Sequence, residues 1–137
     1  MTTRKTALKK QIQSKKKPKK LYKNAFWLPV ETAVYVPSTS KTQKKIEKKI
    51  LMKRVANVRK DLSNRYGGYT SYKAVGGYVM KKDGKLVKEK VVKVTAFATK
   101  KDFNKNKSAV EKKIKSWGKK WGQESVGYEH EGDLYYI

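Results

Sequence analysis

The chain has 137 residues, of which 36 are Lys or Arg and 11 are Asp or Glu, so its formal net charge is +25. Self-repulsion at this charge destabilises a compact chain unless a polyanion neutralises it, and the partner that we expect is RNA or DNA. The absence of cysteine excludes disulfides, thiolate zinc sites and a cysteine nucleophile. Apolar runs are too short to span a bilayer or to form a signal peptide, so we expect no membrane partner and an intracellular or virion-associated location.

The first twenty residues form a basic segment with nine Lys and Arg residues and no acid. Because they are poor in apolar side chains, they cannot offset the entropy of ordering, and we predict a disordered tail over 1–20. The run Lys15 to Lys20 is similar to a nuclear-localisation signal and equally to the basic extensions of ribosomal proteins, so the nucleus is an alternative location. Residues 21–137 hold all the aromatic residues and are predicted to form a single domain.

The first two elements of this domain are a strand and a helix. Residues 30–36 are β-branched, alternate roughly with period two and end before Pro37, which predicts a strand. Residues 40–43 fit a capping box, and apolar residues then recur at three- and four-residue spacings until Gly67 and Gly68. This periodicity predicts a long helix, with an apolar stripe formed by Ile46, Ile50, Leu51, Val55, Val58 and Leu62.

A hairpin, a second helix and a short β segment complete the chain. Residues 69–80 and 86–98 are rich in Tyr, Val and Thr and flank an Asp83–Gly84 turn, which predicts a long antiparallel hairpin. A second capping box at 108–111 precedes a helix that places Trp117 and Trp121 on its apolar face. The last fifteen residues are predicted to form one strand or two short ones.

The order strand, helix, strand, strand, helix, strand resembles the ferredoxin-like superfold, an α+β split βαβ arrangement in which two helices cover one face of an antiparallel sheet. This resemblance concerns element order alone. Because the same fold serves many functions, it does not indicate one.

From charge and composition the chain is predicted to be a non-enzymatic nucleic-acid-binding protein that contacts the phosphate backbone with low sequence specificity. We expect it to belong to a larger nucleoprotein particle, such as a ribosome-like, viral or mobile-element assembly. No catalytic residue, metal site or cofactor is predicted. The predicted phosphate contacts lie in the tail and the first helix: Lys15, Lys16, Lys17, Lys19, Lys20, Lys44, Lys45, Lys48, Lys49, Lys53, Arg54 and Arg59.

Several aromatic and glycine residues have two interpretations. Tyr69, Tyr72 and Tyr78, and with them Tyr35, could stack unpaired bases on an open sheet face, although cross-strand packing is the simpler interpretation. Trp117 and Trp121 are predicted to lie in the core because they continue an apolar stripe. Gly67–Gly68 is interpreted as a helix end, and Gly76–Gly77 as a strand bulge.

The C-terminal fifteen residues contain four acids and no Lys or Arg. This acidic segment could pair with a lysine-rich helix or dock a protein partner. His130 lies among these acids, and we interpret it as part of an exposed hairpin tip and not as a metal ligand. Two other functions stay open: a structural or oligomerising module, and a small metal-dependent nuclease that uses Glu31, Glu129 or Asp133.

Overall fold

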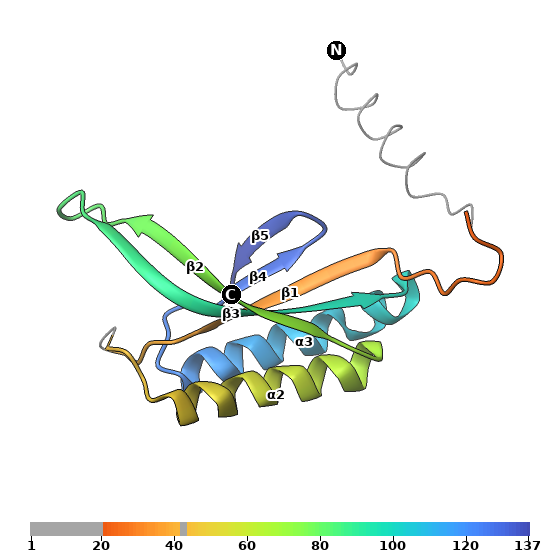
Figure 1. The fold of residues 1–137 in the computed structure, drawn as a ribbon, viewed down its shortest axis with the longest axis horizontal. Helices are drawn as coiled ribbons and strands as arrows, with labels where there is room; N and C mark the ends of the chain where they lie inside the picture. Colours follow the sequence, from red (N-terminus) through yellow and green to blue (C-terminus); the bar gives the residue numbers. More distant parts are fainter. Residues whose placement is uncertain (1–20, 42–43) are drawn as a thin grey trace, which may run out of the picture.

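The computed structural model describes residues 21–41 and 44–137. The elements in chain order are β1 (Val30–Pro37), α2 (Lys48–Tyr66), β2 (Thr70–Val79), β3 (Leu86–Ala98), α3 (Lys100–Lys120), β4 (Gly127–His130) and β5 (Asp133–Tyr136). They form two layers, a twisted sheet and a pair of helices that cover one of its faces (Figure 1). The predicted tail, residues 1–20, lies outside the described residues.

The sheet is antiparallel and has the strand order β2-β3-β1-β4-β5. β1 pairs with β3 from Val30 opposite Ala98 to Pro37 opposite Val91, and with β4 on its other side. The predicted α+β arrangement with two helices on one sheet face is confirmed. The C-terminal segment forms two short strands, so β5 is an additional strand at the edge of the sheet.

The core lies between the sheet and the two helices. Alternate residues of the central strands, such as Val34 and Val94, are fully buried against Val58 and Leu62 of α2 and Ile114 of α3. The predicted core positions Trp117 and Trp121 are confirmed, since both are almost completely buried and their rings stack with centroids 5.9 Å apart.

The start of α2 differs from the prediction. The helix begins at Lys48 after the N-cap Glu47, whose side chain makes no capping bond, and not at the capping box predicted over 40–43. Backbone bonds before the helix replace it: Ser40 N donates to Lys44 O, and Ile46 N donates to Ser38 O. This turn leads the chain from β1 to α2, so Ile46, which was predicted to belong to the apolar stripe of the helix, lies before the helix. The C-terminal end is as predicted, with Gly67 in the left-handed region at φ 92°.

The hairpin of β2 and β3 turns at Asp83 and Gly84, as the sequence predicts, with Gly84 at φ 69°. The pairing runs without interruption through Gly76 opposite Glu89 and Gly77 opposite Lys88, so the predicted bulge is wrong. The end of the hairpin that carries this turn projects past the helices, as Figure 1 shows. Exposed apolar side chains at Val75, Val79 and Leu86 belong to this projecting part.

The start of α3 also differs from the prediction. The helix begins at Lys100 and not at Ser108, and Thr99 caps it by accepting a hydrogen bond from Asp102 N at 3.1 Å. Asp102 in the first turn complements the helix dipole. The apolar pattern before Ser108 is sparse, since within Lys100–Lys107 only Phe103 is buried.

We expect Thr99→Ala to lower the free energy of unfolding by about 1 kcal/mol, because the cap bond to Asp102 N is lost. Ser108→Ala is the matched control: this exposed serine lies inside the helix, where alanine has the higher helix propensity. Urea unfolding measures both. A loss in Ser108→Ala with none in Thr99→Ala would place the helix start where the sequence pattern predicted it.

Candidate functional site

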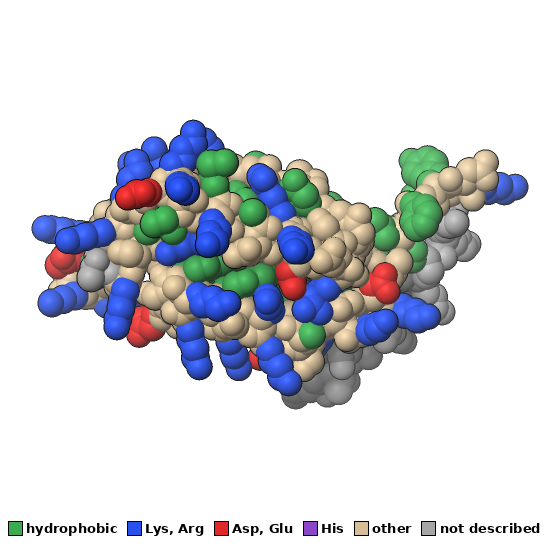
Figure 2. Space-filling model, turned by 90° about the horizontal axis from the view of Figure 1, so that it is seen from below, with side chains coloured by type: hydrophobic (Ala, Val, Ile, Leu, Met, Phe, Trp, Pro, Cys, Tyr) green, Lys and Arg blue, Asp and Glu red, His purple; other side chains and the backbone are tan. Residues whose placement is uncertain are grey.

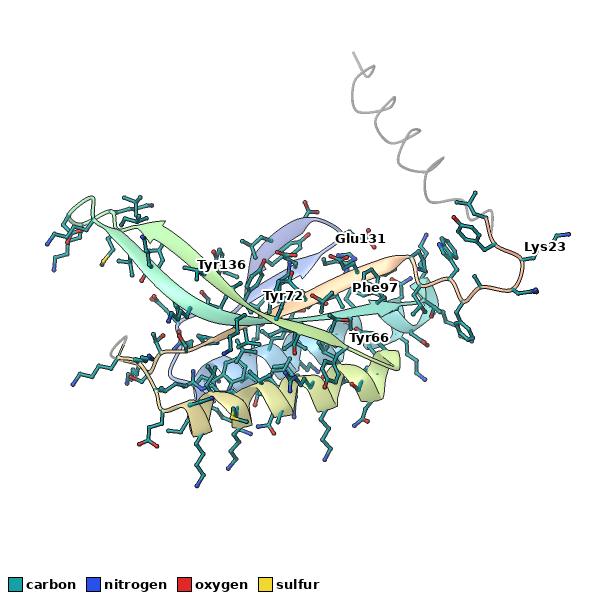
Figure 3. The ribbon with its side chains drawn as sticks, in the orientation of Figure 1. Lys23, Tyr66, Tyr72, Phe97, Glu131 and Tyr136 are labelled. Atoms are coloured by element: carbon teal, nitrogen blue, oxygen red, sulfur yellow. The ribbon has the colours of Figure 1, made fainter. Side chains whose placement is uncertain are left out.

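The face of the sheet that points away from α2 and α3 carries the candidate site, and we call it the open face. Its residues follow from strand alternation and from the pairing registers, because directly paired residues point to the same side. Figure 3 shows Tyr72, Phe97 and Tyr136 on this side, with Tyr66 on the side of the helices. The charged open-face residues are Glu31, Glu89, Lys93 and Glu129.

One register row crosses all five strands on the open face. Tyr72 of β2 pairs with Lys93 of β3, Lys93 with Tyr35 of β1, and Gly127 of β4 with Tyr136 of β5. Tyr35 lies over Gly127, where an added Cβ would come within 3.1 Å of the Tyr35 ring. Glycine at this position therefore leaves room for the ring, and the row becomes an aromatic surface with an ammonium group in its middle.

Lys93 and Glu129 form the polar centre of this row. Lys93 Nζ lies 2.9 Å from Glu129 Oε2, and the Tyr35 hydroxyl donates a hydrogen bond to Glu129 Oε1. The same ammonium lies 5.5 Å from the centroid of the Tyr35 ring and 5.8 Å from that of Tyr72, within the range of cation–π attraction. Both side chains of the ion pair are mostly buried. Dissolved salt therefore screens their attraction less than it screens that of a fully exposed ion pair.

The acid–base state of Glu129 reflects its surroundings. Burial, and after it the negative charge of Glu31, raise the pKa of the Glu129 carboxyl above its ordinary value. The ammonium of Lys93 at 2.9 Å acts in the opposite direction and favours the ionised carboxylate. A ligand with its own positive charge would meet two carboxylates here, those of Glu129 and Glu31, against the single ammonium group of Lys93.

A second carboxylate lies further along β3, on the part of the open face that the hairpin provides. Glu89 Oε1 accepts a hydrogen bond from Thr39 Oγ1 at 3.0 Å. It stands opposite Gly76, and Tyr78 follows two residues later on the same face of β2. The small residues Ala74 and Gly76 lie between Tyr72 and Tyr78 on this face of β2.

A cleft of about 420 Å³ lies where β2 begins and β3 ends, beside the last turn of α2 and the first turn of α3. The cleft is lined by three open-face residues, Thr70, Thr95 and Phe97. Tyr69, from the segment before β2, and Asp102, from the first turn of α3, also line it. The cleft therefore lies at the edge of the sheet, where the open face meets the ends of the two helices.

The two faces of the protein differ in sign of charge. The helices α2 and α3 carry sixteen Lys or Arg residues against three acids, and Figure 2 shows lysines spread over the side on which they lie. The strands contribute three carboxylates and one ammonium to the open face. Phosphate would be attracted to the helix side and repelled from the open face, whereas a small cation would prefer the open face.

The residues predicted to contact phosphate have different locations. Lys15, Lys16, Lys17, Lys19 and Lys20 lie outside the described residues, while Lys44, Lys45, Lys48, Lys49 and Lys53 are exposed before or on α2. Arg59 is partly buried and bonds to the Ser71 hydroxyl through two nitrogens.

Arg54 has a structural role that its sequence position did not indicate. It is buried, and its guanidinium donates to the carbonyl oxygens of Pro37, Thr39 and Trp121. These bonds join the end of β1 to the end of α3, so Arg54 is not available to a phosphate.

The predicted stacking residues Tyr69, Tyr72 and Tyr78 are all partly exposed. Tyr72 and Tyr78 lie on the open face, and Tyr69 lines the cleft. Base stacking by these residues stays a prediction, as does docking of a protein partner on the acidic C-terminal segment.

His130 is not an exposed loop residue. Its ring stacks on Phe103 with centroids 4.1 Å apart, so it helps to attach β4 to α3. Among the described residues no group of three or more His, Asp or Glu side chains could hold a metal ion. Glu31 and Glu129 share the open face, whereas Asp133 pairs with His130 and points to the other side of the sheet, so the three carboxylates that we considered for a nuclease do not lie together. Neither α2 nor α3 has the long apolar stretch that crossing a bilayer requires.

The central part of this site was not predicted from the sequence. Tyr35 was considered only as a sheet aromatic, Glu129 only as an acid of the C-terminal segment and as a possible nuclease residue, and Lys93 was not considered. One signal was present: Lys93 interrupts the apolar run of residues 91–96, and a charge within a central strand usually has a buried partner.

No protein-family model matches the chain, and none of the curated proteins matches it. The solved structures give clear matches. A phage SAM lyase in complex with S-methyl-5′-thioadenosine shares the fold with a TM-score of 0.57 and 20% identity, over 85% of this chain and 95% of the lyase. A phage SAM lyase in the apo state matches with a TM-score of 0.50 and 20% identity, over 79% of this chain and 87% of the lyase.

These matches correct two predictions. The chain was predicted to be a nucleic-acid-binding protein and not to be an enzyme, and both predictions are wrong in view of an enzyme that shares the fold over nearly its whole length. The error came from net charge, which describes the whole surface. The two helices contribute +13 and the first twenty residues +9 to the net charge of +25, and the few carboxylates of the open face change this total little.

Proposed function

We propose that the chain is an S-adenosylmethionine (SAM) lyase that binds its substrate on the open face and releases S-methyl-5′-thioadenosine. The observation that carries this proposal is the shared fold, which extends over 95% of a phage SAM lyase that holds this nucleoside. The charge of the open face supports it independently. SAM carries a sulfonium and an α-ammonium group, and three carboxylates with several tyrosine rings are a suitable surface for such a cation.

The reaction that we propose needs no water and no cofactor. An oxygen of the methionyl carboxylate attacks Cγ and forms a C–O bond, while the Cγ–S bond breaks and its electron pair goes to sulfur. The products are S-methyl-5′-thioadenosine and protonated homoserine lactone, so atoms and charge balance. In this step the negative charge of the carboxylate and the positive charge of the sulfonium are both lost. An environment that excludes water therefore stabilises the transition state relative to the bound substrate, in which the two charges are separate.

The residues of the central row have separate roles in this proposal. The Glu129 carboxylate holds the α-ammonium group, and the rings of Tyr35 and Tyr72 lie beside the sulfonium. Lys93 is a positioning residue: it fixes Glu129 at 2.9 Å and is itself held over both rings. Orientation matters most here, because an internal attack gains its rate from holding carboxylate and Cγ close together.

The test is to incubate the purified full chain with SAM and to separate the products by liquid chromatography with mass detection. We expect S-methyl-5′-thioadenosine and homoserine lactone in equal amounts, above the spontaneous decomposition measured with heat-denatured protein. In heavy-oxygen water, lactone closure leaves the Cγ oxygen unlabelled, whereas hydrolysis places the label on Cγ. No product above the background would refute the lyase proposal, and label on Cγ would make the chain a hydrolase.

A further inference from the structure

The projecting end of the β2–β3 hairpin has an apolar patch on its helix side, opposite the open face. Val75, Val79 and Leu86 point to this side because they alternate with the open-face residues of their strands. Their side chains are 70%, 62% and 61% exposed. Leu86 lies over Gly77, since a Cβ added there would be 3.4 Å from Leu86 Cδ1. Gly77 stands between Val75 and Val79 on this face of β2, so the three side chains form one surface, which we call the hairpin patch.

Lysines border the hairpin patch. Five of them are exposed, three at the turn and two on the same face of β3: Lys81, Lys82, Lys85, Lys88 and Lys90. The two acids in this part of the hairpin are placed differently. Glu89 points to the open face, and Asp83 Oδ1 accepts a hydrogen bond from Lys85 N within the turn. The hairpin patch is therefore apolar at its centre and cationic at its rim.

The helices do not cover the hairpin patch, because the hairpin projects past them (Figure 1). Aliphatic side chains that stay in water lose the free energy that burial would give, so a partner that buries them is favoured. The rim determines the charge of that partner. A second copy of this chain would bring its own lysines and a net charge of +25 to the contact, and the two copies would repel each other.

An anionic lipid bilayer matches both parts of the hairpin patch. Its headgroup phosphates attract the lysines, and the acyl region just below them takes up aliphatic side chains. Lysine suits such a boundary, since its apolar stem can lie along the aliphatic groups while its ammonium stays at the level of the phosphates. A nucleic acid would attract the same lysines, but its charged backbone offers no apolar environment to Val75, Val79 and Leu86.

We infer that the hairpin patch docks this protein on the surface of an anionic lipid bilayer. The helices lie on the same side of the sheet, so their lysines face the same membrane, while the open face on the opposite side stays accessible from water. From the sequence we expected no membrane partner, because its apolar runs are too short to span a bilayer. A hairpin that lies at the surface needs no spanning run. The inference is independent of the proposed lyase function, because the hairpin patch shares no residue with the central row.

The lysine rim is tested by sedimenting the full chain with vesicles. We expect wild type to bind vesicles of phosphatidylcholine and phosphatidylglycerol in equal parts, and not vesicles of phosphatidylcholine alone. The variant with Lys81→Gln, Lys82→Gln and Lys85→Gln should bind about 100-fold more weakly, about fivefold for each lysine. Its matched control changes three exposed lysines at the other end of β3, where α3 begins: Lys100→Gln, Lys101→Gln and Lys105→Gln. An equal loss in both variants would mean that net charge alone causes adsorption, and would overturn the inference.

The apolar centre is tested without a change of charge. Val75→Thr and Val79→Thr together keep the β-branched shape that suits a strand and replace a methyl with a hydroxyl group at each site. We expect about 10-fold weaker binding to the anionic vesicles, with an unchanged circular dichroism spectrum because both positions lie outside the core. Leu134→Thr, at a half-exposed apolar site on β5, is the control and should bind like wild type. Full affinity in the double Thr variant would overturn the inference.

Insertion is observed directly with an environment-sensitive dye. The chain has no cysteine, so Val79→Cys and Lys101→Cys each accept a single label. The emission of the label at 79 should shift to shorter wavelength when anionic vesicles are added, and that of the label at 101 should not. Equal shifts, or none at 79, would overturn the docking geometry. Sedimentation velocity without lipid excludes a second copy: an oligomer that the double Thr variant dissociates would assign the hairpin patch to that contact and overturn the membrane inference.

Discussion

Glu129→Gln is expected to lower kcat/KM for SAM cleavage by about 100-fold. The substitution keeps the shape of the side chain and removes the negative charge that holds the α-ammonium group, and a charge-assisted hydrogen bond contributes about 1.5–3 kcal/mol. Glu124→Gln is the matched control, an exposed glutamate in the loop before β4. Equal rates for wild type and Glu129→Gln would remove Glu129 from the substrate site.

The pH profile separates a charge effect from a structural one. Because Glu129 acts as a carboxylate, kcat/KM should fall as the pH is lowered through its pKa, which burial and Glu31 raise above the ordinary value. Lys93→Met removes the cation that favours ionisation, so the fall should begin at a higher pH, and Glu129→Gln should lack it. Lys88→Met, on the opposite face of β3, should leave the profile unchanged. A Lys93→Met profile that coincides with wild type would contradict the positioning role.

Trp117→Ala is expected to lower the free energy of unfolding by about 3–5 kcal/mol, a large part of the stability of a small domain. The indole is almost completely buried and stacks on Trp121, so its removal leaves a cavity between α3 and the sheet. Urea unfolding followed by circular dichroism measures the loss. Trp27→Ala, at a half-exposed site before β1, is the control and should cost much less. A Trp117→Ala variant as stable as wild type would mean that the core does not include this ring.

Local patterns were sufficient for much of the fold. Alternation and β-branched residues over 30–36, the Asp83–Gly84 turn and Gly67 at a helix end are signals carried by neighbouring residues, and the structure has each of them in place. The apolar stripe through Trp117 and Trp121 likewise indicated burial correctly. In these segments local propensity and tertiary packing favour the same conformation, and a sequence is then enough to predict it.

Tertiary structure decided the helix starts and the site. Ser40 and Ser108 stand at plausible capping positions, but backbone bonds of the turn after β1 and the cap at Thr99 determine where α2 and α3 begin. Glu129 and Lys93 are far apart in the chain and become partners only because β1 lies between β4 and β3. The sequence by itself determined the elements, their order and a large positive charge. The structure places lysines over the helices and carboxylates on the open face. This division depends on which side of each strand the helices cover, and long-range packing determines that side.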